Sequence, residues 1–536
     1  MANNPIGPIE NLAREHAKTR AVAHHPAHKL SLLDHLTARE LLIRDATAHF
    51  RESSAKEPLS PAAEWMLDNF YLVQQSLRQI REDMPPGFYR QLPKLAAGPL
   101  ESYPRIYAVA QELVVTSEAH LDLDRVKRFV HLYQDITPLT IGELWALPAM
   151  LRLGILECLA QAVGRITGLP RENSLPAMTL AGERGTSLPH ATTNDELVAN
   201  CIISLRTLAI QDWQAFFESV SRVEQVLRDD PANVYTAMDR ETRDRYRKVI
   251  EQLAFATGRD ECQVARAAIE LAQREGAPRV ALKDTRSVNA PRAAHVGYYL
   301  LDAGRARLET QLGYRVPLGA RVRRWMFDHP TLVYLGSIGL FTLIILLGGM
   351  GYARDAGATF LQWMATGLLL LIPALTVSVS LVNWMVTLVF PPRVLPKMDF
   401  ADGIPAECKT LVVVPSLLSN AAAVKSLLAE LELHFLSNQD PHLYFALLTD
   451  LPDTPQPRRT GDDPLVEQAA SGVRALNEKY PRETSNPFYL LHRDPRWNPR
   501  EEQWMGWERK RGKLHQLNLL LRGGGETAFS VQTGDL

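Results

Sequence analysis

Thr331–Tyr352 reads TLVYLGSIGLFTLIILLGGMGY, a run of 22 positions without a charged side chain. A helix of this length is ~33 Å long, which is enough to cross a ~30 Å hydrocarbon core. After the polar residues 353–356, Gly357–Phe390 is again uncharged and ends at Pro391-Pro392. Soluble proteins also bury apolar runs, but two adjacent runs of this length predict a two-span membrane hairpin over residues 331–390.

Cations flank this hairpin unequally. They are Arg321, Arg323 and Arg324 before the first run, and Arg393 and Lys397 after the second. The connecting loop has only Arg354, next to Asp355. Because positive residues stay cytoplasmic, the soluble parts on both sides are expected in the cytoplasm. If Gly357–Phe390 crossed the membrane twice, the two soluble parts would lie on opposite sides. Two spans need ~40 residues, however, and this run is shorter.

Composition argues against nucleic-acid binding, a zinc site and secretion. The chain has 536 residues and a formal net charge of -1, so nucleic acid is not an expected partner. Its four cysteines form no CxxC or Cys/His pattern with zinc spacing, which predicts reduced structural thiols. The amino terminus lacks the apolar stretch of a signal peptide. Residues 1–30 are polar and are interpreted as a mobile tail.

Residues 31–313 are predicted to form a helical cytoplasmic domain. Thr140 with Glu143 is typical of a capping box ahead of an apolar helix, and strand-like alternation is nearly absent. The domain shows no catalytic constellation. His190 and His295 have no Cys or carboxylate at ligand spacing, which favours structural or surface roles for both.

Residues 405–536 follow a different pattern, in which short apolar runs alternate with helical segments. Strands are predicted at 410–415, 443–448 and 488–491, and helices at 421–435 and 464–479. This alternation indicates a doubly wound α/β sheet, in which ligands bind at the carboxyl ends of the strands. Asp450 lies at such an end, in a loop that also contains Asp453.

A basic segment follows the third strand. Trp504–Gly525 places Arg509, Lys510, Arg511 and Lys513 around Gly512, ahead of a helix predicted over residues 514–521 with Asn518 near its middle. Cations and a glycine beside a helix start can hold a diphosphate. The alternative is a basic surface loop near anionic lipid headgroups.

At these residues the chain resembles the cyclic β-1,2-glucan synthases, large bacterial inner-membrane glycosyltransferases. The matching motifs occur in the family's order from about Ser31 onward: Leu41–Asp45 (LLIRD), His295–Leu300 (HVGYYL), Leu448–Asp453 (LTDLPD), Trp507–Leu514 (WERKRGKL) and Leu520–Gly523 (LLRG). The resemblance implies a cytoplasmic GT-A-type domain that uses UDP-glucose to build β-1,2-linked glucan. It also implies self-priming, elongation, cyclisation and export of the ring, and a phosphorylase-like carboxy-terminal domain.

The resemblance also assigns expected site residues by position. Asp450 corresponds to the first acidic residue of GT-A enzymes, which contacts the uridine. Lys513 and Asn518 fall where related transferases have a Lys-containing segment beside the donor, and Val413-Val414-Pro415 resembles the first donor-site strand and turn. We therefore expect the substrate-binding set to be Pro415, Asp450, Asp453, Lys510, Lys513 and Asn518, with the catalytic residues unassigned.

The chain departs from the family pattern in length. A GT-A enzyme needs an Asp-x-Asp for a divalent metal, Mg or Mn, and a base for the acceptor hydroxyl. No Asp-x-Asp occurs after Asp450, so these groups are expected beyond residue 536, on a carboxy-terminal remainder with which this amino-terminal portion would act. Expected partners are UDP-glucose, the growing β-1,2-glucan and the lipid bilayer.

The expected fold is therefore mostly α: a helical domain, a two-span hairpin and the first half of an α/β GT-A-like domain. The expected function is the amino-terminal part of a membrane glucosyltransferase that is inactive alone. The alternatives are another membrane GT-A β-glucan synthase and a non-catalytic membrane scaffold.

Overall fold

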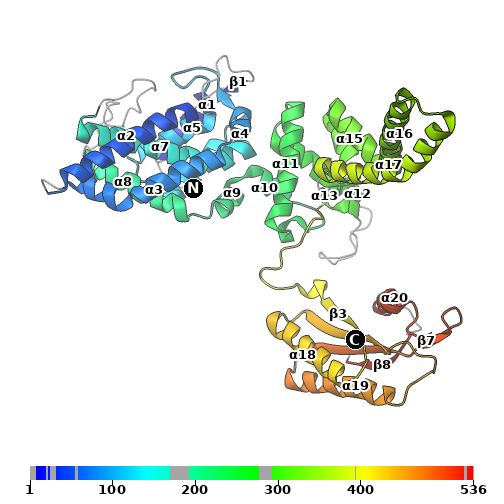
Figure 1. Ribbon diagram of the computed structural model, residues 1–536. Coiled ribbons are helices and arrows are strands. Elements are labelled where there is room, and N and C mark those ends of the chain that lie inside the picture. The colour runs from blue at the N-terminus through cyan, green and yellow to red at the C-terminus, as the bar shows by residue number, and fades with distance from the viewer. Residues whose placement is uncertain are drawn as a thin grey trace. The chain divides into compact units, whose positions relative to one another are not determined.

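The computed structural model describes residues 8–19, 22–23, 32–54, 58–169, 192–276, 292–390, 392, 394–483, 485–523 and 528–534, so His190 lies outside the described residues. The chain is mostly helical, as expected, and divides into two units, Met1–Lys397 and Met398–Leu536. The first unit holds nearly all the helices, and the second holds a four-stranded sheet (Figure 1).

Helix α7 (Ile141–Thr167) forms the centre of the helical unit. It packs against α2 (Leu32–Ser53), α3 (Pro61–Asp83), α5 (Arg105–Thr116) and α8 (Asn194–Ile210) (Figure 1). Thr140 and Glu143 form the expected capping box at its start, and Gly168 ends it at φ 69°. The αL conformation at this position favours glycine.

The other elements of this unit are mostly short helices. They are α1 (Pro8–Thr19), α4 (Pro86–Gln91), α6 (Leu123–Gln134), α9 (Trp213–Val220), α10 (Arg222–Leu227), α11 (Arg240–Thr257), α12 (Glu261–Gly276), α13 (Val296–Leu301), α14 (Arg305–Leu312) and α15 (Leu318–Asp328), with 3-10 turns at Tyr235–Ala237 and Arg292–Ala294. Two-residue strands β1 (Val22–Ala23) and β2 (Lys94–Leu95) pair antiparallel.

The amino-terminal segment corrects one expectation. Residues 1–30 were expected to form a mobile tail, but α1 lies within them and packs against α6. Ala13 and Ala17 are buried, and the Thr137 hydroxyl donates to the Ala17 carbonyl at 2.8 Å. The helix was not predicted because the segment is polar overall and its apolar face is narrow and made of small residues.

Several buried polar groups in the helical unit are paired with one another. Arg105 Nε donates to Glu143 Oε1 at 2.8 Å, and both side chains are buried. His295 does have a carboxylate partner: its Nδ1 lies 2.8 Å from Asp230 Oδ2, and its Nε2 lies 2.9 Å from the Tyr246 hydroxyl. Asp230 is 65 residues away in sequence, so local spacing could not reveal it. These contacts fix the orientation of the His295 ring.

Helices α16 (Pro330–Asp355) and α17 (Phe360–Val389) form the expected helical hairpin. In the described part of the chain, three helices are long and apolar enough to cross a membrane: α7, α16 and α17. The apolar window of α7 is 94% buried within the unit, against 11% for α16 and 17% for α17. Helix α7 is therefore a core helix, while α16 and α17 present their apolar side chains outward. Because α17 is a single helix that continues through Pro373, it does not divide into two separate spans.

The second unit is an α/β sheet. Its strands are β3 (Thr410–Leu417), β4 (Leu443–Asp450), β5 (Phe488–Arg493) and β8 (Phe529–Thr533), in the order β3-β4-β5-β8. The first three pair in parallel, as the sequence pattern predicted, and β8 pairs antiparallel with β5. The sequence pattern did not predict β8 or the short hairpin of β6 (Arg496–Asn498) and β7 (Gln503–Met505), because their runs are too short to show periodicity.

Helices cover both faces of this sheet (Figure 1). Helices α18 (Ala421–Ser437) and α19 (Asp462–Lys479) lie on one face and bury Phe445, Leu447 and Phe488. Helix α20 (Arg509–Leu521) lies on the other face and packs through Leu517. A single 3-10 turn, Ala406–Cys408, precedes β3. This layering leaves the carboxyl ends of β3 and β4 beside the start of α20.

Candidate functional site

A cavity of about 360 Å³ lies at the carboxyl ends of β3 and β4. Parallel α/β sheets bind ligands at this edge, because loops leave the strands there and the helix starts point toward it. Its walls come from the end of β3, the loop after β4 and the segment that opens α20: Pro415, Ser416, Leu417, Asp450, Leu451, Pro452, Asp453, Gly506, Arg509, Lys510 and Lys513. Five of the six expected substrate-binding residues are therefore brought together.

Asp450, the last residue of β4, is the buried acidic group of this cavity. Its backbone is paired with Leu417 of β3, and its side chain is only 3% exposed. Arg493, at the end of β5, donates to both carboxylate oxygens, from Nε at 2.8 Å and from Nη2 at 3.0 Å. Lys513 Nζ lies 3.0 Å from Asp450 Oδ2. Two buried cations therefore hold one buried carboxylate in a fixed orientation.

Lys513 forms hydrogen bonds to the carboxyl ends of both β3 and β4. Its ammonium donates to the Ser416 carbonyl at 2.9 Å and the Leu448 carbonyl at 3.3 Å, in addition to its contact with Asp450. Burial lowers the pKa of Lys513, while the neighbouring Asp450 acts in the opposite direction. An ammonium has three donors, and protein acceptors occupy all three here. A ligand would have to displace one of them to bind Lys513 directly.

Arg493 also fixes the turn that leads into α20. Its guanidinium donates to the backbone carbonyls of Trp507 at 3.1 Å and Arg509 at 3.2 Å, and to Gln516 Oε1 at 2.7 Å. Glu508 and Arg509 have φ values of 48° and 47°, in the left-handed region that non-glycine residues rarely adopt. Such backbone persists only where its surroundings hold it, and Arg493 supplies those contacts.

Gly506 allows this turn to approach Asp450. A Cβ atom at Gly506 would lie 2.7 Å from the Asp450 carboxyl carbon, which is closer than van der Waals contact permits. Neither Gly506 nor Arg493 was predicted as a site residue from the sequence. The rule that selected Asp450, a polar residue at the carboxyl end of a parallel strand, would also have selected Arg493 had β5 been extended by two residues.

Two further cations line the cavity and are open to solvent. Arg509 is exposed and pairs with Asp453 at 2.9 Å and Glu501 at 3.2 Å. Lys510 is exposed and forms no ion pair within the described residues. Lys510 is therefore the cation of this wall that is available to a ligand without loss of an existing contact.

Asn518 is the expected site residue that does not line the cavity. It is exposed on α20, beyond the first turn of that helix. The cavity therefore gives no support to a role for Asn518 in binding.

The divalent metal implied by the family resemblance does not fit the residues in place. Across the described ranges, no three His, Cys, Asp or Glu side chains converge in a way that could hold a metal ion. Arg493 and Lys513 already occupy most of the acceptor positions of the Asp450 carboxylate. We therefore derive no step through a metal from these residues.

The fold and cavity define a mostly helical protein with an apolar hairpin and an α/β unit that has a cavity at the carboxyl ends of its strands. No family model matches the chain. The chain is 31% identical, over 551 aligned positions, to the cyclic beta-(1,2)-glucan synthase NdvB of Rhizobium meliloti. The alignment covers 91% of this chain and 19% of the relative, so the chain spans about a fifth of the protein that it matches. The resemblance to cyclic β-1,2-glucan synthases indicated by the sequence motifs is confirmed.

Proposed function

We propose that this chain is part of a membrane-bound glucosyltransferase that makes cyclic β-1,2-glucan, and that its α/β unit binds the donor UDP-glucose. The similarity over nearly the whole chain to a cyclic β-1,2-glucan synthase supports the reaction class. The single observation that carries the binding role is the cation-lined cavity at the carboxyl ends of β3 and β4.

The cavity offers different groups to the two ends of a nucleotide diphosphate. A carboxylate has about four acceptor positions, and Arg493 and Lys513 use three of those of Asp450. The remaining position would accept a hydrogen bond from the uracil ring N–H. Lys510, with Arg509 beside it, would bind the diphosphate through charge-assisted hydrogen bonds. In this proposal Lys513 holds Asp450 and the strand ends in place instead of contacting phosphate.

The hairpin of α16 and α17 would anchor this transferase in the bacterial inner membrane. Their outward apolar surfaces support membrane insertion, and the cations at Arg321, Arg323 and Lys397 support a cytoplasmic location for both soluble units. UDP-glucose is a cytoplasmic metabolite, so this orientation places the cavity where the donor is. The metal and the base for the acceptor hydroxyl would come from residues outside those described.

Lys510→Ala is the sharpest test of the donor site, because Lys510 is exposed and its removal leaves no buried group unpaired. A charge-assisted hydrogen bond contributes about 1.5–3 kcal/mol, so the affinity for UDP-glucose should fall about ten- to a hundredfold. Equilibrium dialysis with radiolabelled UDP-glucose measures this affinity. Arg522→Ala, which removes an exposed cation from the far end of α20, is the matched control and should bind as wild type does.

Lys513→Ala tests whether Lys513 positions Asp450 and the strand ends, in contrast to the diphosphate binding proposed for Lys510. It removes a partner from buried Asp450 and donors from two backbone carbonyls, so we expect both affinity and melting temperature to fall. Unchanged affinity for UDP-glucose in Lys510→Ala would show that Lys510 does not bind the diphosphate. Unchanged stability in Lys513→Ala would contradict its positioning role.

A further inference from the structure

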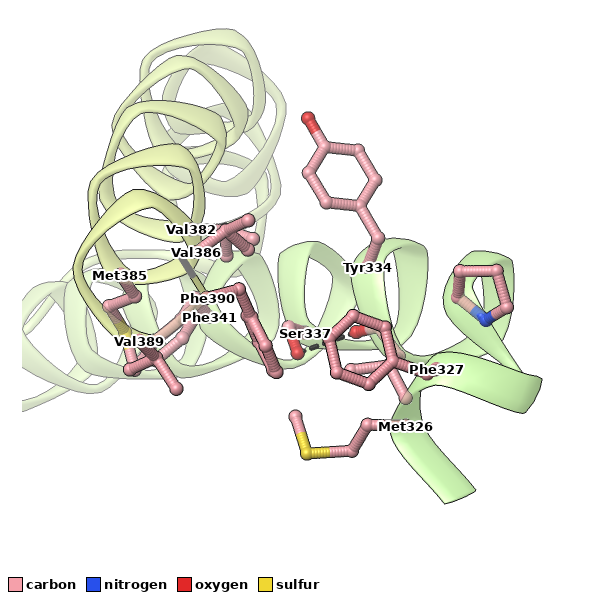
Figure 2. Close-up of a pocket in the computed structure, with 12 residues that line it drawn as sticks. Met326, Phe327, Tyr334, Ser337, Phe341, Val382, Met385, Val386, Val389 and Phe390 are labelled. Carbon is pink, nitrogen blue, oxygen red and sulfur yellow. Dashed lines mark hydrogen bonds between the residues drawn. The ribbon is translucent and has the colours of Figure 1, made fainter. Parts of the chain in front are cut away.

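An apolar groove of about 420 Å³ lies between α15, the start of α16 and the end of α17 (Figure 2). Met326 and Phe327 of α15 face side chains of the hairpin, and the rings of Phe327 and Phe390 lie 5.2 Å apart. The lining also includes Tyr334, Ser337, Phe341, Val382, Met385 and Val386.

The few polar atoms of this groove already have partners. The Ser337 hydroxyl donates to the Val333 carbonyl at 2.6 Å, and the Tyr334 hydroxyl donates to Asn383 Oδ1 at 2.9 Å. A polar ligand would therefore find no free hydroxyl donor on Ser337 or Tyr334. The lining favours a hydrocarbon chain, which needs only apolar contact.

Helix α15 supplies the charge at one end of this groove. Arg323 precedes Met326 and Phe327 by three and four residues, so it is their neighbour on the surface of α15, just outside the lining of the groove. Arg324 is paired with Glu309 at 2.6 Å, whereas Arg321 and Arg323 are exposed and form no ion pair within the described part of the chain. Trp325 is 49% exposed, as is typical of side chains at a membrane–water interface.

We propose that this groove binds one acyl chain of an anionic phospholipid, whose headgroup contacts Arg321 and Arg323. This inference rests on the membrane insertion of α16 and α17 in the proposed function. Pro330 begins α16 and Val389 ends α17, so the groove lies at the headgroup level of the membrane and its cations at the adjoining surface. A further helix, ~10 Å across, cannot enter a groove of this volume, and one that covered it would have to bring carboxylates to pair with the arginines.

Native mass spectrometry of the delipidated full chain tests the inference with two added lipids of identical acyl chains, phosphatidylglycerol and phosphatidylcholine. We expect tighter binding of phosphatidylglycerol. Arg321→Gln with Arg323→Gln should lower that affinity about fivefold for each cation removed, with little change for phosphatidylcholine. Arg354→Gln, which removes an exposed cation from the last turn of α16, is the matched control and should change neither.

Ser337→Phe tests the position of the acyl chain, because the added ring would fill the groove. It should reduce binding of both lipids. Equal affinity for the two lipids in the wild type, or unchanged binding in Ser337→Phe, would overturn the inference. Crosslinking from a photoreactive side chain at position 337 to protein instead of lipid would identify a helix-packing site and would also overturn it.

Two readouts on the same preparation separate this inference from the proposed function. Resistance of the chain to alkaline extraction from membranes reports insertion, and dialysis with UDP-glucose reports the donor site. Loss of lipid selectivity with both readouts intact overturns the groove assignment alone. Extraction of the chain by alkali overturns the membrane placement and the groove assignment together.

Discussion

At the scale of single residues, the α/β unit depends on one buried cluster of charges. Asp450, Arg493 and Lys513 are each almost completely buried, and the Asp450 carboxylate pairs with both cations. Breaking a buried pair costs more than the pair contributes, because the remaining charge is left without a partner in a low-dielectric environment. The cluster therefore sets the geometry of the cavity and makes it sensitive to single substitutions.

Arg493→Gln should destabilise the α/β unit by about 3–5 kcal/mol, since it leaves Asp450 with one buried partner and frees the turn before α20. Hydrogen exchange of β4 and β5 amides measures the effect as a loss of protection. Arg496→Gln removes an exposed arginine three residues away and should leave protection unchanged. Wild-type protection in Arg493→Gln would show that the cluster does not stabilise the sheet.

Glu261 predicts a pH dependence in the helical unit. Its carboxylate accepts the Ile141 N–H at 2.7 Å, and burial raises its pKa from 4.5 to about 8. Between these two values the folded protein retains a proton that the unfolded chain has lost. Stability should therefore fall as pH rises from about 4.5 to 8, by up to about 1.4 kcal/mol per pH unit.

Glu261→Gln should flatten this slope and raise stability at pH 8 relative to pH 5. The melting temperature of the detergent-solubilised chain, measured at both pH values, checks the sign. Glu270→Gln, an exposed carboxylate on the same helix, should leave the slope unchanged. A slope in Glu261→Gln equal to that of the wild type would assign the pH dependence to other groups.

At the scale of elements, α20 is positioned by glycines at its start. A Cβ atom at Gly512 would lie 2.0 Å from the Trp507 carbonyl oxygen, a contact with backbone that no side-chain movement relieves. The first turn of α20 carries Lys510 and ends near Lys513, so a displacement there moves the cavity wall. The glycine is required by the close packing of the turn against the helix.

Gly512→Ala should therefore lower UDP-glucose affinity and expose the segment from Trp507 to Lys513 to proteases. His515→Ala, at an exposed position of the same helix, is the control and should do neither. Limited proteolysis with mapping of the cleavage sites measures the first effect, and equilibrium dialysis the second. If Gly512→Ala resists cleavage and binds normally, the helix start is not as tightly held as the structure indicates.

The elements that have long, regular sequence patterns could be predicted from the sequence. The parallel strands, α7 with its capping box, and the helices α16 and α17 were predicted because apolar periodicity and run length determine them. The sequence did not reveal the bidentate contact of Arg493 with Asp450 or the left-handed turn at Glu508, since both depend on residues that are distant in sequence. Lys513 was predicted at the site, but only its three contacts suggest a positioning role.

At the scale of the whole molecule, the proposed membrane hairpin would decide on which side of the membrane each soluble part lies. An even number of crossings would leave both units on one side, and the flanking arginines favour the cytoplasmic side. Helix α7 shows why length and hydropathy alone do not identify a span. It is long and apolar enough to cross a membrane, yet it is covered by other helices of its unit.

Cysteine labelling of intact spheroplasts with an impermeant maleimide tests this topology. Single cysteines at Ile210 and Ser471, both exposed, should react only after the membrane is permeabilised. A cysteine at Ala356, in the connection between α16 and α17, should react in intact spheroplasts and serves as the control. Labelling at just one of the first two positions would contradict the two-span arrangement.

The central claim is that the cavity at the carboxyl ends of β3 and β4 binds a uridine diphosphate sugar, and equilibrium dialysis of the wild-type chain with radiolabelled UDP-glucose tests it most directly. We predict saturable binding of one molecule per chain that unlabelled UDP displaces and free glucose does not, because the proposed contacts are to the uridine and the diphosphate. Binding that never saturates, or that UDP fails to displace, would contradict the account and would leave the α/β unit without a donor site.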